Sequence, residues 1–218
     1  MQIEHAFDVY SIEELYDMTD MNLDEVDEDI MEKGESFLNK DCRRNSENTY
    51  HSDFNCGGYA LNTFNWYKPY EGAFEWREKL LYCWLEDYYD QDGLIAEPSE
   101  IIKELENRLV IRDTLYMLRQ FKGRLRRVEP DEELWEGERL IAYRVGFEYW
   151  FDEAEQNFID IDIDFHYRFY DKELNVWFEK MGGGNIRVCD DDDTETDDCW
   201  VYPYWKYGSN IIYLALQM

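Results

Sequence analysis

Residues 159–166 alternate strictly between apolar and polar side chains, and no other pattern in the chain constrains the fold as strongly. The apolar set is Ile159, Ile161, Ile163 and Phe165, and the polar set is Asp160, Asp162, Asp164 and His166. Successive side chains of a strand point to opposite faces, so this spacing predicts a strand with one apolar and one polar face.

The segments around this strand predict an antiparallel arrangement in the second half of the chain. Residues 139–145 have the composition of a strand, and residues 176–178 are expected to pair back as a hairpin after a turn at 171–175. A glycine turn at 182–184 and a closing strand at 211–216 complete the predicted set.

The first half of the chain has helical periodicity instead. A helix is expected from Cys56 to Tyr67, where Pro69 ends the pattern. A second helix carries the stripe from Phe74 to Tyr88 and stops at residues 91–93. A third begins with Ser99 as its cap.

Residues 1–50 form an acidic segment that is also expected to be helical, with Ser11 and Glu14 at capping-box spacing. Helices followed by antiparallel strands predict an α+β fold. We therefore expect two parts: the N-terminal segment of residues 1–50, and a domain of residues 51–218 in which helices pack on a C-terminal antiparallel sheet.

The chain carries 51 Asp and Glu against 22 Lys and Arg, a formal net charge of −29 over 218 residues. This charge repels phosphate backbones and disfavours direct nucleic-acid binding, although a protein that imitates DNA would share it. Aromatic residues make up 17%, which separates the chain from disordered acidic tails. No run approaches the roughly 18 apolar residues of a membrane span, and no signal peptide is recognisable.

Five cysteines, an odd number without CxxC spacing, favour a reducing compartment and predict a cytoplasmic protein. Three histidines without paired-ligand spacing predict no zinc site, and no cofactor is expected. The acidic run at 190–198 either forms a solvated loop, which is the commoner case, or gathers Ca²⁺ through carboxylate oxygens. Residues 103–127 are basic, and either balance an acidic face internally or dock an anionic partner.

Cys56 stands at the start of a predicted helix, in the run Asn55-Cys56-Gly57-Gly58-Tyr59. Unpaired N–H groups and the helix dipole favour a thiolate there, and the same N–H groups can face an oxyanion. The pattern predicts that Cys56 is the most reactive thiol of the chain. A buried structural cysteine is the alternative that this spacing leaves open.

His166 is the candidate base for such a nucleophile, because it lies on the polar face of the alternating strand. Asp164 and Arg168 flank it at two-residue spacing. A cysteine nucleophile needs a nearby imidazole to take its proton. The alternative is a solvated histidine on an ordinary strand.

The segment Asn55-Cys56-x-Gly58-Tyr59-Ala60-Leu61 resembles the nucleophile segment of papain-like and NlpC/P60-like cysteine peptidases and amidases. Residues 140–145, 164–168 and 177–182 are similar to bacterial and phage proteins that carry an N-C-x-x-Y-A segment followed by D-x-H-F-Y-R and W-x-H-K-x-G strands. The resemblance implies a papain-like fold with Cys56 as nucleophile and His166 as base. Asn55 and Gly57 would then bind the oxyanion or position the substrate.

The chain departs from that pattern at Glu179, where the similar proteins have a second histidine before the lysine. A carboxylate at this position could orient His166 as the third member of a triad. Asp164 and Asn185 are the other candidates for this role, because the register of the hairpin cannot be read from the sequence.

The resemblance implies a hydrolase that cleaves a peptide or amide bond in a peptide or protein substrate. The alternative is a non-enzymatic acidic protein. It would be either an inhibitor that mimics nucleic acid and binds a basic protein, or an inactive phage or virion component with the same fold.

Overall fold

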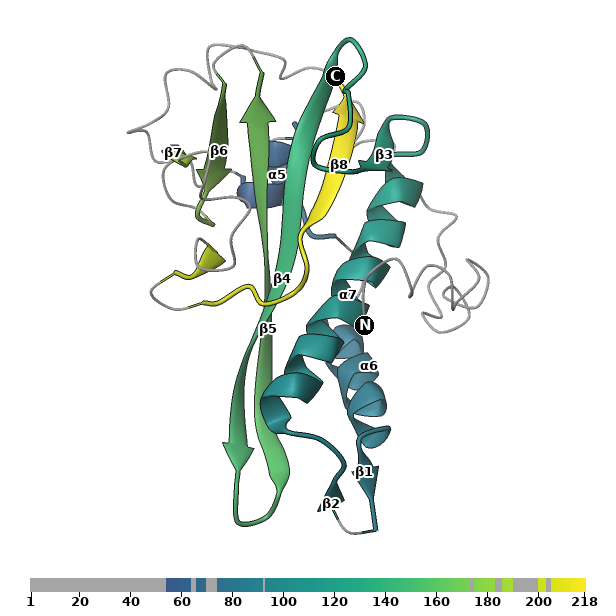
Figure 1. The fold of residues 1–218 in the computed structure, drawn as a ribbon, viewed down its shortest axis with the longest axis vertical. Coiled ribbons are helices and arrows are strands. Elements are labelled where there is room, and N and C mark those ends of the chain that lie inside the picture. The colour runs from purple at the N-terminus through teal and green to yellow at the C-terminus, as the bar shows by residue number, and fades with distance from the viewer. Residues whose placement is uncertain are drawn as a thin grey trace.

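A six-stranded antiparallel sheet forms the framework, with the strand order β3-β8-β4-β5-β6-β7 (Figure 1). Its strands are β3 (Leu125–Val128), β4 (Glu138–Asp152), β5 (Asn157–Asp171), β6 (Val176–Lys180), β7 (Ile186–Cys189) and β8 (Ile212–Gln217). This computed structural model describes residues 54–63, 66–69, 74–91, 93–172, 175–182, 186–189, 200–202 and 205–218. The expected N-terminal segment of residues 1–50 lies outside these residues, as do Asn185 and the acidic run at 190–198.

β4 and β5 form a long hairpin that reaches well beyond the other strands of the sheet (Figure 1). The predicted alternation is confirmed from Asp160 to His166, but it fails at Ile159. A bulge there leaves Ile159 without a partner on β4 and 65% exposed. The extra residue of the bulge reverses the alternation, so Phe158 and Ile161 are both buried in the core while Ile159 points away from it.

The described helices are α5 (Cys56–Ala60), α6 (Phe74–Glu86) and α7 (Pro98–Gln120). α5 is shorter than the predicted helix, because the chain turns at Asn62, which has a left-handed φ of 59°. α6 also ends earlier than predicted, and the two short strands β1 (Tyr89–Asp90) and β2 (Gly93–Leu94) follow it.

The long helix α7 begins one residue before the predicted cap. Its N-cap is Glu97, and Pro98 lies in the first turn, so Ser99 is inside the helix. Proline is favoured at this place because its fixed φ suits the helix and it has no N–H to leave unpaired. Among the described residues, no helix is long and apolar enough to cross a bilayer.

The sheet buries side chains on both of its faces. One face packs against α5 and α7, where Met117, Tyr143 and Tyr167 belong to the larger core. The other face carries a second cluster that includes Trp200 and Tyr207. Successive side chains of β5 therefore point into different hydrophobic clusters. The predicted α+β fold with an antiparallel sheet is confirmed.

The segment that carries Tyr207 crosses the second face directly over Gly146 of β4. A Cβ at Gly146 would lie 2.3 Å from the carbonyl oxygen of Lys206 and 2.9 Å from the Cα of Tyr207. Val145 and Ser209 fix the crossing through two hydrogen bonds of 2.9 and 3.1 Å. The missing side chain at Gly146 thus lets Tyr207 pack against the sheet.

Candidate functional site

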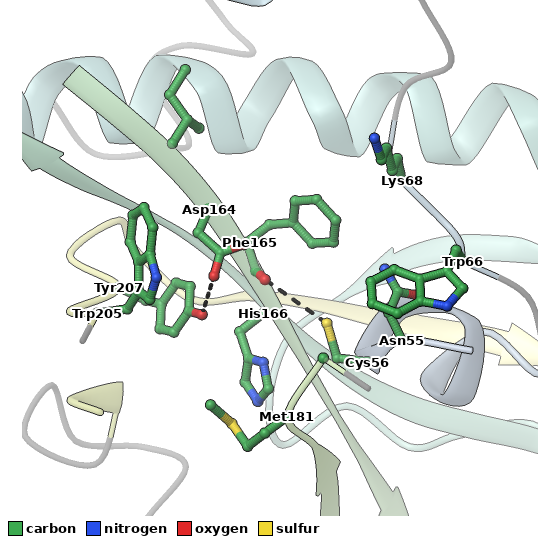
Figure 2. Close-up of a pocket in the computed structure, with 12 residues that line it drawn as sticks. Asn55, Cys56, Trp66, Lys68, Asp164, Phe165, His166, Met181, Trp205 and Tyr207 are labelled. Atoms are coloured by element: carbon green, nitrogen blue, oxygen red, sulfur yellow. Dashed lines mark hydrogen bonds between the residues drawn. The ribbon is translucent and has the colours of Figure 1, made fainter. Parts of the chain in front are cut away.

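A cavity of about 260 Å³ opens beside β5, just past the point where β6 ends (Figure 2). Cys56 and His166 both line it, so the structure brings the two main candidate residues to one site. The rest of the lining is largely apolar and aromatic, with Trp66, Trp205 and Tyr207 among its members. Trp66 is 56% exposed at the rim.

Asn55 holds the start of α5 in place. Its side-chain oxygen accepts a hydrogen bond from the N–H of Gly58 at 2.9 Å, as an N-cap residue does. Its amide nitrogen donates to the carbonyl of Tyr67 at 2.6 Å. Asn55 therefore positions Cys56 by capping the helix and by tying it to the following segment.

Gly57 allows α5 to approach β5 closely. A Cβ at this position would lie 2.9 Å from the ring of Tyr67 and 3.1 Å from the ring of Tyr167. The first contact is shorter than Cβ atoms adopt and the second is tight, so a side chain here would push α5 away from the Tyr67 and Tyr167 rings and move Cys56 off the edge of the strand. Gly57 acts in positioning the nucleophile candidate.

The Cys56 thiol is buried and donates a hydrogen bond to the carbonyl of Phe165 at 3.8 Å (Figure 2). Burial and the nearby charge of Asp164 raise the pKa of the thiol to about 12, from an ordinary value of 9.0. Backbone hydrogen bonds from Tyr167 and Gly57 lower this pKa only partly. The sequence predicted a lowered pKa, and this was wrong because desolvation outweighs the N–H groups at the helix start.

The His166 ring is held by Glu179. Its Nε2 lies 3.0 Å from a Glu179 oxygen, and both side chains are almost completely buried. Glu179 is paired with Arg168 across β5 and β6, so it lies diagonally next to His166 on the same face. The predicted contact between the two residues is therefore present in the structure.

Glu179 is also the centre of a wider polar cluster. Arg168 donates to the same carboxylate oxygen at 2.9 Å, and the hydroxyl of Tyr202 donates to it as well. Burial alone would raise the pKa of Glu179, but the bond from His166 and the charges of His166 and Arg168 lower it well below its ordinary range. Glu179 is thus a carboxylate, and Nε2 of His166 must be the donor of their hydrogen bond.

Asp164 and Asn185 were the other candidates for orienting His166. Asp164 lines the cavity on the same face of β5, but its carboxylate accepts a hydrogen bond from the Tyr207 hydroxyl at 2.7 Å. Asn185 lies outside the described residues. The described contacts of His166 therefore favour Glu179 for this role.

No hydrogen bond joins Cys56 to His166 within the described part of the chain. The thiol donates to Phe165, and His166 uses Nε2 for Glu179. The remaining nitrogen, Nδ1, makes no hydrogen bond to any residue that the structure describes. Nδ1 is the atom that can accept a proton in the cavity.

Sequence reasoning missed the aromatic residues that enclose His166. The Tyr207 ring stacks on the imidazole with centroids 5.4 Å apart, and Trp200 and Tyr202 contact it edge-on at 5.9 and 5.2 Å. All three come from residues 200–207, where five of eight residues are aromatic. The high aromatic content of residues 200–207 was the signal available in the sequence. The fold decides that these rings pack around His166 rather than around another polar side chain.

Iodoacetamide is expected to label Cys83 faster than Cys56 in the folded protein near neutral pH. The thiolate is the reactive species, and Cys56 is buried with a pKa of about 12, whereas Cys83 is exposed on α6. Peptide mapping by mass spectrometry over a time course measures both rates, and denaturation in urea should bring them together. Labelling of Cys56 ahead of Cys83 would contradict the burial seen here.

The chain matches no family model, no curated protein and no solved structure in the three comparisons made. Among the described residues, no group of three or more His, Cys, Asp or Glu side chains is arranged to hold a metal ion.

Proposed function

We propose that the protein is a cysteine-nucleophile hydrolase of peptide or amide bonds, with Cys56 as nucleophile and His166 as base. The observation that carries this proposal is the 3.0 Å hydrogen bond between His166 and Glu179. The imidazole held in this way lines the same cavity as Cys56. A cysteine at a helix start beside a strand histidine also supports the papain-like arrangement that the sequence motifs imply.

Glu179 orients the imidazole and fixes its tautomer in this mechanism. The carboxylate accepts Nε2–H, so Nδ1 is the basic nitrogen. The raised pKa of Cys56 means that the resting nucleophile is a neutral thiol. Proton transfer to His166 must therefore accompany the attack, rather than precede it as in an enzyme with a stable thiolate.

The reaction proceeds in two steps. Sγ of Cys56 attacks the substrate carbonyl carbon while the thiol proton moves to Nδ1 of His166. The backbone N–H of Cys56 faces the oxyanion, and the Gly57 N–H stays bonded to the sulfur. Collapse of this intermediate breaks the C–N bond, and the proton on Nδ1 passes to the leaving amine. Water then cleaves the thioester by the same route and restores the thiol.

A set of peptide aminomethylcoumarin amides tests this function. We expect the protein to release coumarin from at least one of them, and Cys56→Ser to lower the rate by about a thousandfold or more. Cys83→Ser is the matched control, because Cys83 is exposed on α6, and its rate should stay unchanged. Equal release by Cys56→Ser, or no release from any amide, contradicts the proposal.

A second candidate function is a non-enzymatic acidic protein that binds a basic partner. The buried, protonated Cys56 thiol favours it, because that state is also the one expected of a structural cysteine. The hydrolysis assay separates the two functions, since only the hydrolase depends on the sulfur of Cys56.

A further inference from the structure

Over the ranges that the structure describes, one edge of β5 lacks a neighbouring strand over much of its length, and Cys56 bonds to it at Phe165 and Tyr167. β6 pairs only with residues 168–171 of β5, and from residue 159 to 167 no strand among the described residues pairs with that edge. β6 ends at Lys180, and the chain turns at Gly182, which has a φ of +48°. An open strand edge presents N–H and C=O groups that another extended chain can pair with.

The backbone groups at this edge can be assigned from the Cys56 contact. The Phe165 carbonyl points to the open edge, because it accepts the hydrogen bond of the Cys56 thiol there. Alternate residues of a strand direct their N–H and C=O groups to the same edge, so Ile163 and Ile161 do so too. The Ile161 N–H is bonded to the side chain of Asp160 at 3.0 Å, a local partner in place of a strand.

The open edge leads directly into the cavity. Ile163, Asp164 and Phe165 line the cavity together with Cys56. Figure 2 shows Asp164 and Phe165 beside the Cys56 thiol. A chain that pairs with Ile161 and Ile163 as a continuation of β6 would therefore carry its backbone to the sulfur. Ile161 and Ile163 are buried on the α7 side of β5. One face of such an added strand would therefore lie beside these apolar side chains, and its other face would lie on the opposite side of the sheet.

The face of β5 opposite to α7 is acidic beside this edge. Asp160, Asp162 and Glu148 are exposed, and Glu148 stands directly opposite Asp162 on β4. None of the three forms an ion pair with a residue that the structure describes. Like charges directly opposite each other destabilise a sheet, and cationic side chains on a neighbouring strand would relieve this.

We infer that the open edge of β5 binds an extended polypeptide with lysine or arginine at alternate positions, as an antiparallel strand that continues β6. Its basic side chains lie beside Asp160 and Asp162, and its other side chains lie on the isoleucine face. Strand addition of this kind takes affinity from main-chain hydrogen bonds and specificity from alternate side chains. The inference rests on the proposed function, because it names the substrate class of that site.

Fluorescence anisotropy with a labelled hexapeptide of alternating lysine and valine tests the inference on the full chain. In antiparallel pairing, the peptide residues directly opposite Ile161 and Ile163 have their side chains on the isoleucine face of the sheet, and their backbone N–H groups point toward β5. These are the valines of the peptide. N-methylation of the valines should weaken binding about tenfold or more, because it removes the hydrogen bonds to the Ile161 and Ile163 carbonyls. N-methylation of the lysines, whose N–H groups face solvent, should leave binding nearly unchanged.

The charge requirement is tested with the double variant Asp160→Asn, Asp162→Asn. Its affinity for the unmodified hexapeptide should fall about three- to tenfold at low ionic strength. The amide oxygen introduced by Asp160→Asn can still accept the hydrogen bond from the Ile161 N–H, so the strand should fold normally. The matched control is Asp131→Asn, an exposed aspartate in the β3–β4 loop, which should bind as the wild type does.

Equal affinity for the two methylated peptides, weaker binding of the lysine-methylated peptide instead, or unchanged binding by the double variant overturns the inference. Mass spectrometry of the hexapeptide after incubation separates this from the proposed function. A peptide that binds as expected and stays intact counts against hydrolysis alone. A peptide that is cleaved while both methylated forms bind equally well counts against strand addition alone.

Discussion

Replacing Glu179 by glutamine is expected to destabilise the fold by about 3–5 kcal/mol and to lower turnover by orders of magnitude. The carboxylate is 1% exposed and accepts hydrogen bonds from His166, Arg168 and Tyr202. Glutamine has nearly the same shape but no charge, so the guanidinium of Arg168 would stay buried without its counter-ion. Because this pair is buried, the substitution lowers the stability of the fold as well as turnover.

Urea unfolding followed by tryptophan fluorescence measures this loss. Because the pKa of Glu179 is lowered in the folded state, its stabilisation is present above the unfolded value of 4.5 and is lost as the pH falls toward the folded value. The difference between wild type and Glu179→Gln should therefore shrink on acidification below about pH 4.5. Glu133→Gln, an exposed change in the β3–β4 loop, should stay within about 0.5 kcal/mol of the wild type. A Glu179→Gln protein as stable as this control would contradict the buried cluster.

Replacing Gly146 by alanine is expected to destabilise the protein by about 3 kcal/mol and to disturb the cavity. The new methyl group would lie 2.3 Å from the carbonyl oxygen of Lys206 and 2.9 Å from the Cα of Tyr207. Both are backbone atoms, which cannot rotate away as a side-chain end can. The crossing segment must therefore lift from the sheet, and the Tyr207 ring must leave its place against His166.

Gly123→Ala is the comparison for this change. Gly123 has a φ of +79° and no heavy atom near its Cβ position, so alanine there adds only backbone strain of about 1–2 kcal/mol. Thermal unfolding compares the two variants, and near-ultraviolet circular dichroism reports the packing of the aromatic cluster. Only Gly146→Ala should change the dichroism spectrum. An unchanged spectrum for this variant would show that the crossing segment does not depend on the glycine.

The strands of this protein were readable from local pattern. The alternation from Asp160 to His166 reflects the two faces of β5, and the pairing of residues 176–178 with β5 was predicted from the turn between them. The helix boundaries were less well predicted. Asn62 ends α5 early and Glu97 replaces Ser99 as the cap of α7, since several residues in each segment can satisfy the same local preference.

The candidate site was readable only in part. The residue types and their order named Cys56, His166 and Glu179, and the structure places the first two on one cavity and the last two in one hydrogen bond. The choice between Glu179 and Asp164 required the register of β5 against β6. The partners that turn Glu179 into a buried cluster, Arg168 and Tyr202, come from separate parts of the chain.

The sequence by itself determined where apolar side chains repeat at helical spacing and where they alternate as in a strand. These repeats are local, because helix and strand geometry is set by contacts between residues that are near in sequence. The sequence therefore determined the order of helices and strands and the α+β class. The tertiary structure decided the chemical state of the site. The helix start alone would lower the pKa of the Cys56 thiol, but burial and Asp164 raise it. Desolvation depends on every segment packed around a group, and chains distant in sequence supply most of that packing.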